Sequence, residues 1–337
     1  MRKISLQIYE IPTFGQNFQM DFHSNMVLLG FLLAMGFFLA LDLGVFHKKD
    51  HEIGFKEATI WTVIWISMAL LAFILIYFFG EKIHGITDIA GIKEKMTEYG
   101  HPISRQLQNV SDNGTALKIY RENLALEFLT GYIVEYSLSI DNIFVIILIF
   151  ASFGIEKKYY HRVLFWGILG AVAMRFLFIF LFSTLIHRFE WLLLLFGAFL
   201  VFTGVKMFLQ RNKEKKIDTK NHPVIRFTAR YFSVDKDYTG HNFFIRKSGK
   251  LFVSSLFIVL LIVEFSDVIF AVDSIPAIFS ITKDPYIVYF SNIFAIIGLR
   301  SLFFLLINIL DKFRYLNIGL SLLLVLVGVK MILPFLP

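Results

Sequence analysis

Eight long apolar segments limit what this chain can fold into. They cover residues 26–46, 58–79, 122–153, 162–184, 191–209, 249–281, 287–309 and 315–335. A helix needs about 20 mostly apolar residues to cross a bilayer. Hydrophobic residues make up 57% of the chain and charged residues 18%, whereas a soluble domain carries about 25% charged residues. We therefore predict an all-α, polytopic membrane protein with about eight transmembrane segments, surrounded by the lipid bilayer.

Composition also excludes several kinds of site. The chain has no cysteine, which excludes disulfides, thiolate metal sites and thiol nucleophiles. The net charge of +7 is explained by basic loops beside a membrane, since the sequence has no separate basic domain. We expect neither a nucleic-acid partner nor an organic cofactor. The sequence does not indicate an oligomeric state.

Lys and Arg in the short loops predict the orientation. Basic residues gather in the loops near 47–57, 154–161 and 310–314, and the run RNKEKKIDTK lies in the loop 210–248. The short loops on the other side contribute only Arg188 and Lys283. Because cytoplasmic loops are enriched in Lys and Arg, we place the first set inside a bacterial inner membrane. Both termini are then expected on the outer side.

Part of the sequence repeats. SIDN (139–142) matches AVDS (271–274), GAVAMRFLFIFL (170–181) matches AIIGLRSLFFLL (295–306), and TGVKMF (203–208) matches VGVKMI (327–332). The copies are offset by three predicted spans, and an odd offset turns the second copy over in the membrane. This is the inverted-repeat plan of secondary transporters, whose binding site lies near the midplane between the repeats.

The repeat defines four regions. Residues 1–121 form an N-terminal module of two spans with an outer polar insertion, and residues 122–209 form the first three-helix repeat. Residues 210–248 form a basic cytoplasmic loop, and residues 249–337 form the second three-helix repeat.

Carboxylates within the apolar segments are the candidate site. A charge at the bilayer centre costs about 2.5–3.5 kcal/mol on insertion scales, and such residues are functional by default. The five acids that lie in the third and sixth segments are Glu135, Asp141, Glu264, Asp267 and Asp273. Carboxylate, hydroxyl and carbonyl oxygens suit hard cations such as Mg²⁺, Ca²⁺ or Mn²⁺. The supporting oxygen ligands that we predict are Ser137, Ser139, Asn142, Ser274 and the carbonyl of Val272.

Helix geometry leaves two arrangements open. At 100° per residue, Asp273 lies half a rotation from Glu264, so unbroken helices cannot aim all five acids at one small point. Either a helix is interrupted or the acids form two sites. Pro276 favours interruption, because its ring removes the N–H that would bond to the carbonyl of Val272.

Three further charged positions belong to the prediction. Arg175 and Arg300 lie mid-span and are expected to act as counter-ions to the acids, with structural pairing as the alternative role. Asp42 in ALDLGVF is a possible accessory ligand. The two copies also differ, because Leu138 stands where an alignment of VEYSL with VEFSD places Asp267.

Long motifs resemble a known family. EFLTGY (127–132), EYSLSIDN (135–142), HRVLFWGILGA (161–171), LFGAFLVFTGVKM (195–207), EFSDVIFAVDSIPAIF (264–279) and GLRSLFFLL (298–306) are similar to the TerC/Alx family of integral membrane proteins. The resemblance implies inverted three-helix repeats and a link to manganese export and to tellurium-ion resistance. It also implies that Glu135, Asp141, Glu264, Asp267 and Asp273 handle the metal. The stretch 84–118 departs from the family pattern.

The sequence therefore predicts a secondary transporter, not an enzyme, that exports a divalent cation. Mn²⁺ is the expected transported ion, with proton exchange as a possible coupling. The alternative is a membrane scaffold or stress-response protein, of the tellurium-resistance type, in which the intramembrane charges are structural. A membrane-embedded protease is disfavoured, because the GxGD signature is absent from the sequence.

Overall fold

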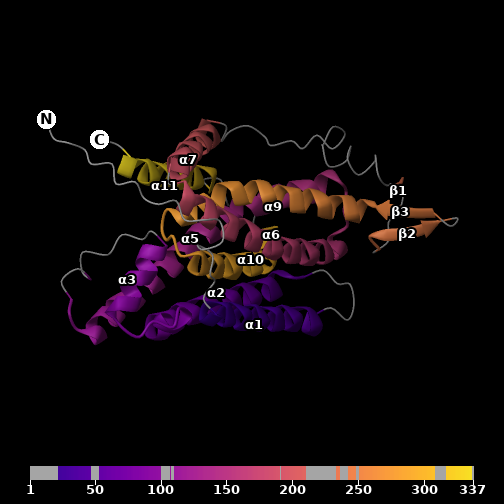
Figure 1. Cartoon of the computed structure of the whole chain (residues 1–337). Helices are drawn as coiled ribbons and strands as arrows, with labels where there is room; N and C mark the ends of the chain where they lie inside the picture. Colours follow the sequence, from indigo (N-terminus) through magenta and orange to yellow (C-terminus); the bar gives the residue numbers. More distant parts are fainter. Residues whose placement is uncertain are drawn as a thin grey trace.

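The structure of the chain is a computed structural model, and each predicted apolar segment contains a helix in it (Figure 1). It describes residues 22–46, 53–99, 107, 110–189, 191–209, 233–235, 242–247, 250–307 and 316–335. The apolar helices are α1 (Phe22–Phe46), α2 (Phe55–Phe79), α5 (Asn113–Ser152), α6 (Tyr160–Arg188), α7 (Trp191–Leu209), α9 (Ser255–Phe279), α10 (Pro285–Ile307) and α11 (Leu316–Ile332). Short 3₁₀ turns cover Gly80–Ile83, Lys157–Tyr159 and Leu333–Phe335.

The helices are membrane-spanning by length and by surface. Among the described residues, seven helices are long and apolar enough to cross a bilayer, and α11 is a shorter apolar helix. Their outer faces carry large apolar side chains: Leu33 is 67% exposed, Phe202 63% and Leu209 71%. Such a surface is stable in lipid but not in water. The prediction of an all-α polytopic membrane protein is confirmed.

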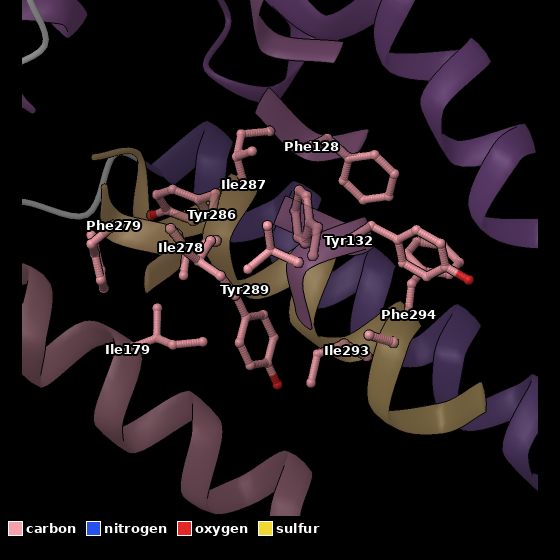
Figure 2. Packing of buried hydrophobic residues seen from close by; sticks show 14 of the residues in the cluster. Phe128, Tyr132, Ile179, Ile278, Phe279, Tyr286, Ile287, Tyr289, Ile293 and Phe294 are labelled. Atoms are coloured by element: carbon pink, nitrogen blue, oxygen red, sulfur yellow. The ribbon is translucent and has the colours of Figure 1, made fainter. Parts of the chain in front are cut away.

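Helix α10 forms the centre of the bundle. Almost all of its residues are buried, and it packs against α2, α5 and α6. Its aromatic residues Tyr286, Tyr289 and Phe294 pack together with Phe128 of α5 and Ile179 of α6 (Figure 2). A helix apolar on all sides is expected to be enclosed by other helices or by lipid, and here helices enclose it.

The two acid-bearing helices are continuous. Helix α5 has 40 residues, which at 1.5 Å per residue is about 60 Å. It therefore tilts or projects beyond a hydrocarbon core of about 30 Å. Helix α9 runs through Pro276 and ends at Phe279. The predicted interruption is wrong, because a proline so close to the end costs one hydrogen bond and leaves only three residues to follow it.

The predicted span at 249–281 begins as a strand, which is a second correction. β1 (Ser233–Asp235), β2 (Phe244–Lys247) and β3 (Lys250–Ser254) form a sheet in the order β1-β3-β2. β2 pairs antiparallel with β3, and β1 pairs parallel with it. Strand β3 leads directly into α9, and Phe244 packs on Phe257 of that helix. The sheet therefore lies at the N-terminal end of α9 (Figure 1). The rest of the loop 210–248 lies outside the described residues.

The described part of the insertion 84–118 is partly helical. Helix α3 (Ile89–Glu98) is capped by Asp88, which accepts from the backbone N–H of Gly91 at 2.8 Å. It buries Ile92 and Met96 and packs against α5. Asp112 caps α5 by accepting from the N–H of Thr115 at 2.8 Å, and hydrogen bonds from Thr115 lower the pKa of this carboxyl. The polar start of α5 therefore belongs to the insertion.

Helices α7 and α11 cross at glycines. A Cβ on Gly204 would lie 2.8 Å from the carbonyl oxygen of Ser321, and one on Gly328 would lie 2.6 Å from that of Gly197. Small residues allow this close backbone approach between membrane helices. Gly204 contacts Ser321, whereas the earlier Gly197 contacts the later Gly328. Helices α7 and α11 are therefore antiparallel here. This is the arrangement that an inverted repeat requires, and the repeat itself stays a prediction.

The glycine crossing gives a stability prediction. Gly328→Ala places a methyl group against the carbonyl oxygen of Gly197 and should lower the free energy of unfolding by about 1–3 kcal/mol. Thermal unfolding of the detergent-purified protein measures this. Gly319→Ala on the same helix is the control, because no atom of the described residues lies within 4 Å of its added Cβ. Equal melting temperatures for the two variants would contradict the close contact.

Candidate functional site

The candidate site is built around Arg175 of α6, whose side chain is fully buried. Its Nη1 lies 2.9 Å from Oε1 of Glu135 on α5. Its Nη2 lies 3.7 Å from Oδ1 of Asp267 on α9. Glu135 is also 0% exposed. One guanidinium therefore holds a carboxylate from each of the two acid-bearing helices.

Neutral side chains complete the surroundings of Arg175. Nη1 also donates to Oγ of Ser274 at 2.9 Å and to Oδ1 of Asn292 on α10. Asn292 is oriented by its own Nδ2, which donates to the carbonyl of Val288 at 3.1 Å. Ser139 donates to Oε1 of Glu135 at 3.2 Å. The site thus receives side chains from α5, α6, α9 and α10.

Several buried polar atoms at this site are unsatisfied. Within the described part of the chain, Oε2 of Glu135, Oδ2 of Asp267 and Oδ1 of Asp273 have no hydrogen-bond partner, and neither do Nε and Nη2 of Arg175. Buried polar groups are nearly always hydrogen-bonded. The unpaired oxygens are therefore available to a further ligand.

Glu264 lies next to this cluster in a space left by a glycine. A Cβ on Gly170 of α6 would lie 2.0 Å from Oε1 of Glu264, so any larger residue there would displace the carboxylate. Glu264 lies within electrostatic range of Asp267. Glu264 is therefore a neighbour of Asp267, one of the two carboxylates that contact Arg175.

Asp141 and Asp273 form a second group. Both are half-buried, and their carboxylates lie within electrostatic range of each other. Asn142 is buried, and Val272 is partly exposed. The hydroxyl of Ser137 donates to the carbonyl of Ile133 at 2.7 Å. Because both helices are unbroken, two separate sites are the alternative that remains for the acids, and this stays a prediction.

The five acids do not form one metal cluster. Across the described residues, no group of three or more His, Asp or Glu side chains is placed to hold a metal ion. The five-acid ligand set stays a prediction. Arg300 is a buried residue of α10. Asp42 belongs to α1, and its side chain lies outside what the structure describes.

Sequence reasoning missed Asn292. The side chain is 0% exposed and contacts Arg175 directly. An asparagine in the apolar run YIVYFSNIFAIIG is a signal that could have found it, because a polar residue within a membrane helix seeks a polar partner. Its partner could not be named without the fold.

A buried, hydrogen-bonded pair of histidine and aspartate was also missed. His84 Nε2 lies 2.8 Å from Oδ2 of Asp284, and His84 Nδ1 lies 3.1 Å from Oγ of Ser24. Asp284 also caps α10 by accepting from the N–H of Tyr286 at 2.9 Å. Burial, with the charge of Asp284 adding to it, raises the pKa of the Tyr99 hydroxyl. A pocket beside the pair is lined by Lys95, Met96, Tyr99, Leu107, Tyr120, Asn123, Leu124, Glu127 and Asp284.

Comparison with known proteins identifies the family. The sequence model that describes the integral membrane protein TerC family matches residues 120–336. The chain belongs to the TerC family. This match covers the helices of both predicted repeats, including every residue in contact with Arg175. No solved structure matches the chain.

Several TerC relatives are similar over most of their length. An uncharacterized membrane protein of Myxococcus xanthus is 44% identical over 303 residues, which is 90% of this chain and 81% of the relative. A protein of Salmonella typhi named putative membrane-bound redox modulator Alx is 38% identical over 304 residues, covering 90% of this chain and 84% of the relative. Its counterpart in Escherichia coli K12 is 37% identical with the same coverage. The chain is thus a multi-pass integral membrane protein.

The buried ion pair of Arg175 and Glu135 predicts a loss of stability when one of the two residues is made neutral. Glu135→Gln removes the carboxylate nearest to Arg175 and should lower the free energy of unfolding by about 1.5–3 kcal/mol, because the shortest charge-assisted hydrogen bond to the fully buried guanidinium is lost. Thermal unfolding in detergent measures the loss. The control is Glu94→Gln on the exposed face of α3. If the two variants melt at the same temperature, the pair does not stabilise the fold.

Proposed function

We propose that this TerC protein is a secondary transporter that exports a divalent metal cation, with Mn²⁺ as the expected cargo. The observation that carries the proposal is an excess of carboxylates over cationic groups within the membrane spans. When all three acids are ionised, Glu135, Asp267 and Glu264 contribute three negative charges, and Arg175 contributes one positive charge. The ionised cluster therefore has a net charge of −3 + 1 = −2.

Such an excess requires a mobile counter-charge. Isolated charges in a low-dielectric interior cost several kcal/mol each unless they are paired. One divalent cation neutralises the cluster, and so do two protons. Metal and protons thus compete for the same carboxylates, which is the basis for exchanging one for the other.

The ligand chemistry favours a hard cation. Carboxylate and hydroxyl oxygens surround the site, and oxygen ligands suit Mg²⁺, Ca²⁺ and Mn²⁺. The chain has no cysteine, so thiolate coordination of Zn²⁺ or Cu⁺ is excluded. The unpaired oxygens of Glu135, Asp267 and Asp273 supply free coordination positions. We therefore assign the five acids as ligands along one route, in two successive groups.

The location follows the inverted-repeat plan. Glu135 comes from the first predicted repeat and Asp267 from the second, so the cargo binds between the repeats. We place the protein in a bacterial inner membrane with both termini outside, since the loops of the opposite side carry most of the basic residues.

Relatives named as putative redox modulators fit this proposal. A chain without cysteine has no thiol with which to exchange electrons. Export of a redox-active cation such as Mn²⁺ changes the redox balance of a cell without redox chemistry in the transporter itself.

A structural role for the charges is the second candidate. The close contact between Arg175 and Glu135 is also what a stabilising ion pair between helices would show. A membrane scaffold of this kind would tolerate neutral substitutions at Asp141 and Asp273, which lie outside that pair.

The two candidates differ in the effect of neutralising the second group. Asp141→Asn or Asp273→Asn should abolish export while the protein still inserts, because each removes one of the two acids that we assign as ligands there. Mn²⁺ flux is measured with purified protein in liposomes, with and without a proton gradient, beside Ca²⁺, Mg²⁺ and Zn²⁺. Glu94→Gln, on α3 outside the spans, is the control. Undiminished Mn²⁺ efflux in either aspartate variant would refute the assignment.

A further inference from the structure

The contacts of Arg175 suggest how the site empties and fills. We propose that Arg175 is a tethered cation that occupies the carboxylates of Glu135 and Asp267 when no metal is bound. Ser274 and Asn292 are the neutral acceptors that retain it when a divalent cation takes its place. This inference rests on the proposed transport function and adds a positioning role for Asn292.

The first support is crowding on one nitrogen. Nη1 of Arg175 carries two N–H groups, yet three acceptors lie within hydrogen-bonding distance: Oε1 of Glu135, Oγ of Ser274 and Oδ1 of Asn292. At any moment one acceptor is left without a full hydrogen bond. Glu135, Ser274 and Asn292 therefore compete for the two N–H groups.

The second support is that the other N–H donors of Arg175 lack well-formed hydrogen bonds. Nε and Nη2 have no hydrogen-bond partner among the described residues, and Nη2 lies 3.7 Å from Asp267. A permanent structural pair of arginine and carboxylate favours two parallel N–H···O bonds. The guanidinium of Arg175 instead lies between its acceptors.

The third support is the division of acceptors by charge. Glu135 and Asp267 are ionisable and come from α5 and α9, whereas Ser274 and Asn292 are neutral. A divalent cation at the carboxylates repels the guanidinium and withdraws its negative partners. The neutral pair then provides hydrogen bonds without holding the metal. The shift needs only rotation of the long arginine side chain.

The Asn292 amide is fixed for this role. Its Nδ2 donates to the carbonyl of Val288, so Oδ1 points toward Arg175. Asn292 therefore positions Arg175 and does not contact the cargo. Its substitution should change metal affinity through the arginine alone.

Two substitutions at Asn292 test this in opposite directions. Asn292→Asp gives Arg175 a carboxylate of its own, which draws the arginine away from Glu135 and Asp267. Mn²⁺ should then bind about tenfold more tightly. Asn292→Leu removes the acceptor, so Arg175 stays on the carboxylates and Mn²⁺ should bind several-fold more weakly. The affinity is measured by electron paramagnetic resonance of free Mn²⁺ with the detergent-purified full chain.

Repeating the Asn292→Asp measurement in a protein without Arg175 separates an effect through the arginine from direct binding of Mn²⁺ by the new carboxylate. In an Arg175→Gln background, Asn292→Asp should no longer tighten Mn²⁺ binding, because the cation through which it acts is gone. Persistence of the tightening would mean that the new carboxylate binds Mn²⁺ itself, and would overturn the proposal. Loss of affinity in both Asn292 variants would overturn it equally, since that is the behaviour of a purely structural residue.

A milder variant covers the case in which Asn292 substitutions do not fold. Ser274→Ala deletes one hydroxyl and should weaken Mn²⁺ binding by about two- to threefold, with Arg175→Lys keeping the charge as a comparison. Wild-type protein that neither binds nor transports any tested cation would refute the proposed function. Wild-type Mn²⁺ binding that Ser274→Ala leaves unchanged would refute only the tethered-cation mechanism.

Discussion

The buried guanidinium of Arg175 is the interaction on which the centre of this structure depends. It joins carboxylates of α5 and α9 and an amide of α10 from its own position on α6. Each of these groups would be costly to bury alone. The four helices therefore cannot separate without exposing an unpaired charge to an apolar interior. The hydrophobic packing around α10 gives the bundle its density, and the arginine fixes which faces of the helices meet.

The same arginine clarifies the relation between the two copies. Glu135 lies six residues before Asp141, and Asp267 lies six residues before Asp273. Both earlier acids contact Arg175, and the two later acids lie near each other. The alignment of VEYSL with VEFSD pairs Leu138 with Asp267. Aligning the two copies on Asp141 and Asp273 instead pairs Glu135 with Asp267. Glu264 is then the unmatched acid. Gly170 makes room for it, and the aligned position in the second copy is Ala295.

The parts of the fold that depend on local pattern were predictable from the sequence. Apolar length predicted the eight helices, and the cost of charge in a membrane singled out the acids of α5 and α9. Features that depend on tertiary contacts were not predictable. Pro276 indicated a break, but α9 continues through it. Apolar length alone places β2 in a loop and β3 in a span, although FFIRKSGKLFVS has the short apolar runs of a hairpin. The partners of Arg175 required knowledge of which helices are neighbours.

A site built only for stability would not have this arrangement. A buried acceptor without a partner costs about 1–3 kcal/mol, and several such oxygens lie on Glu135, Asp267 and Asp273. Replacing a buried ion pair by apolar residues is often neutral or stabilising, so the pair of Arg175 and Glu135 contributes little that leucine could not. An excess of carboxylates, together with an arginine that leaves part of its hydrogen-bonding capacity unused, is unfavourable for an empty protein. In the transport function that we propose, this arrangement becomes favourable when a cation enters and must later leave, because the arginine then limits how tightly the cation is held.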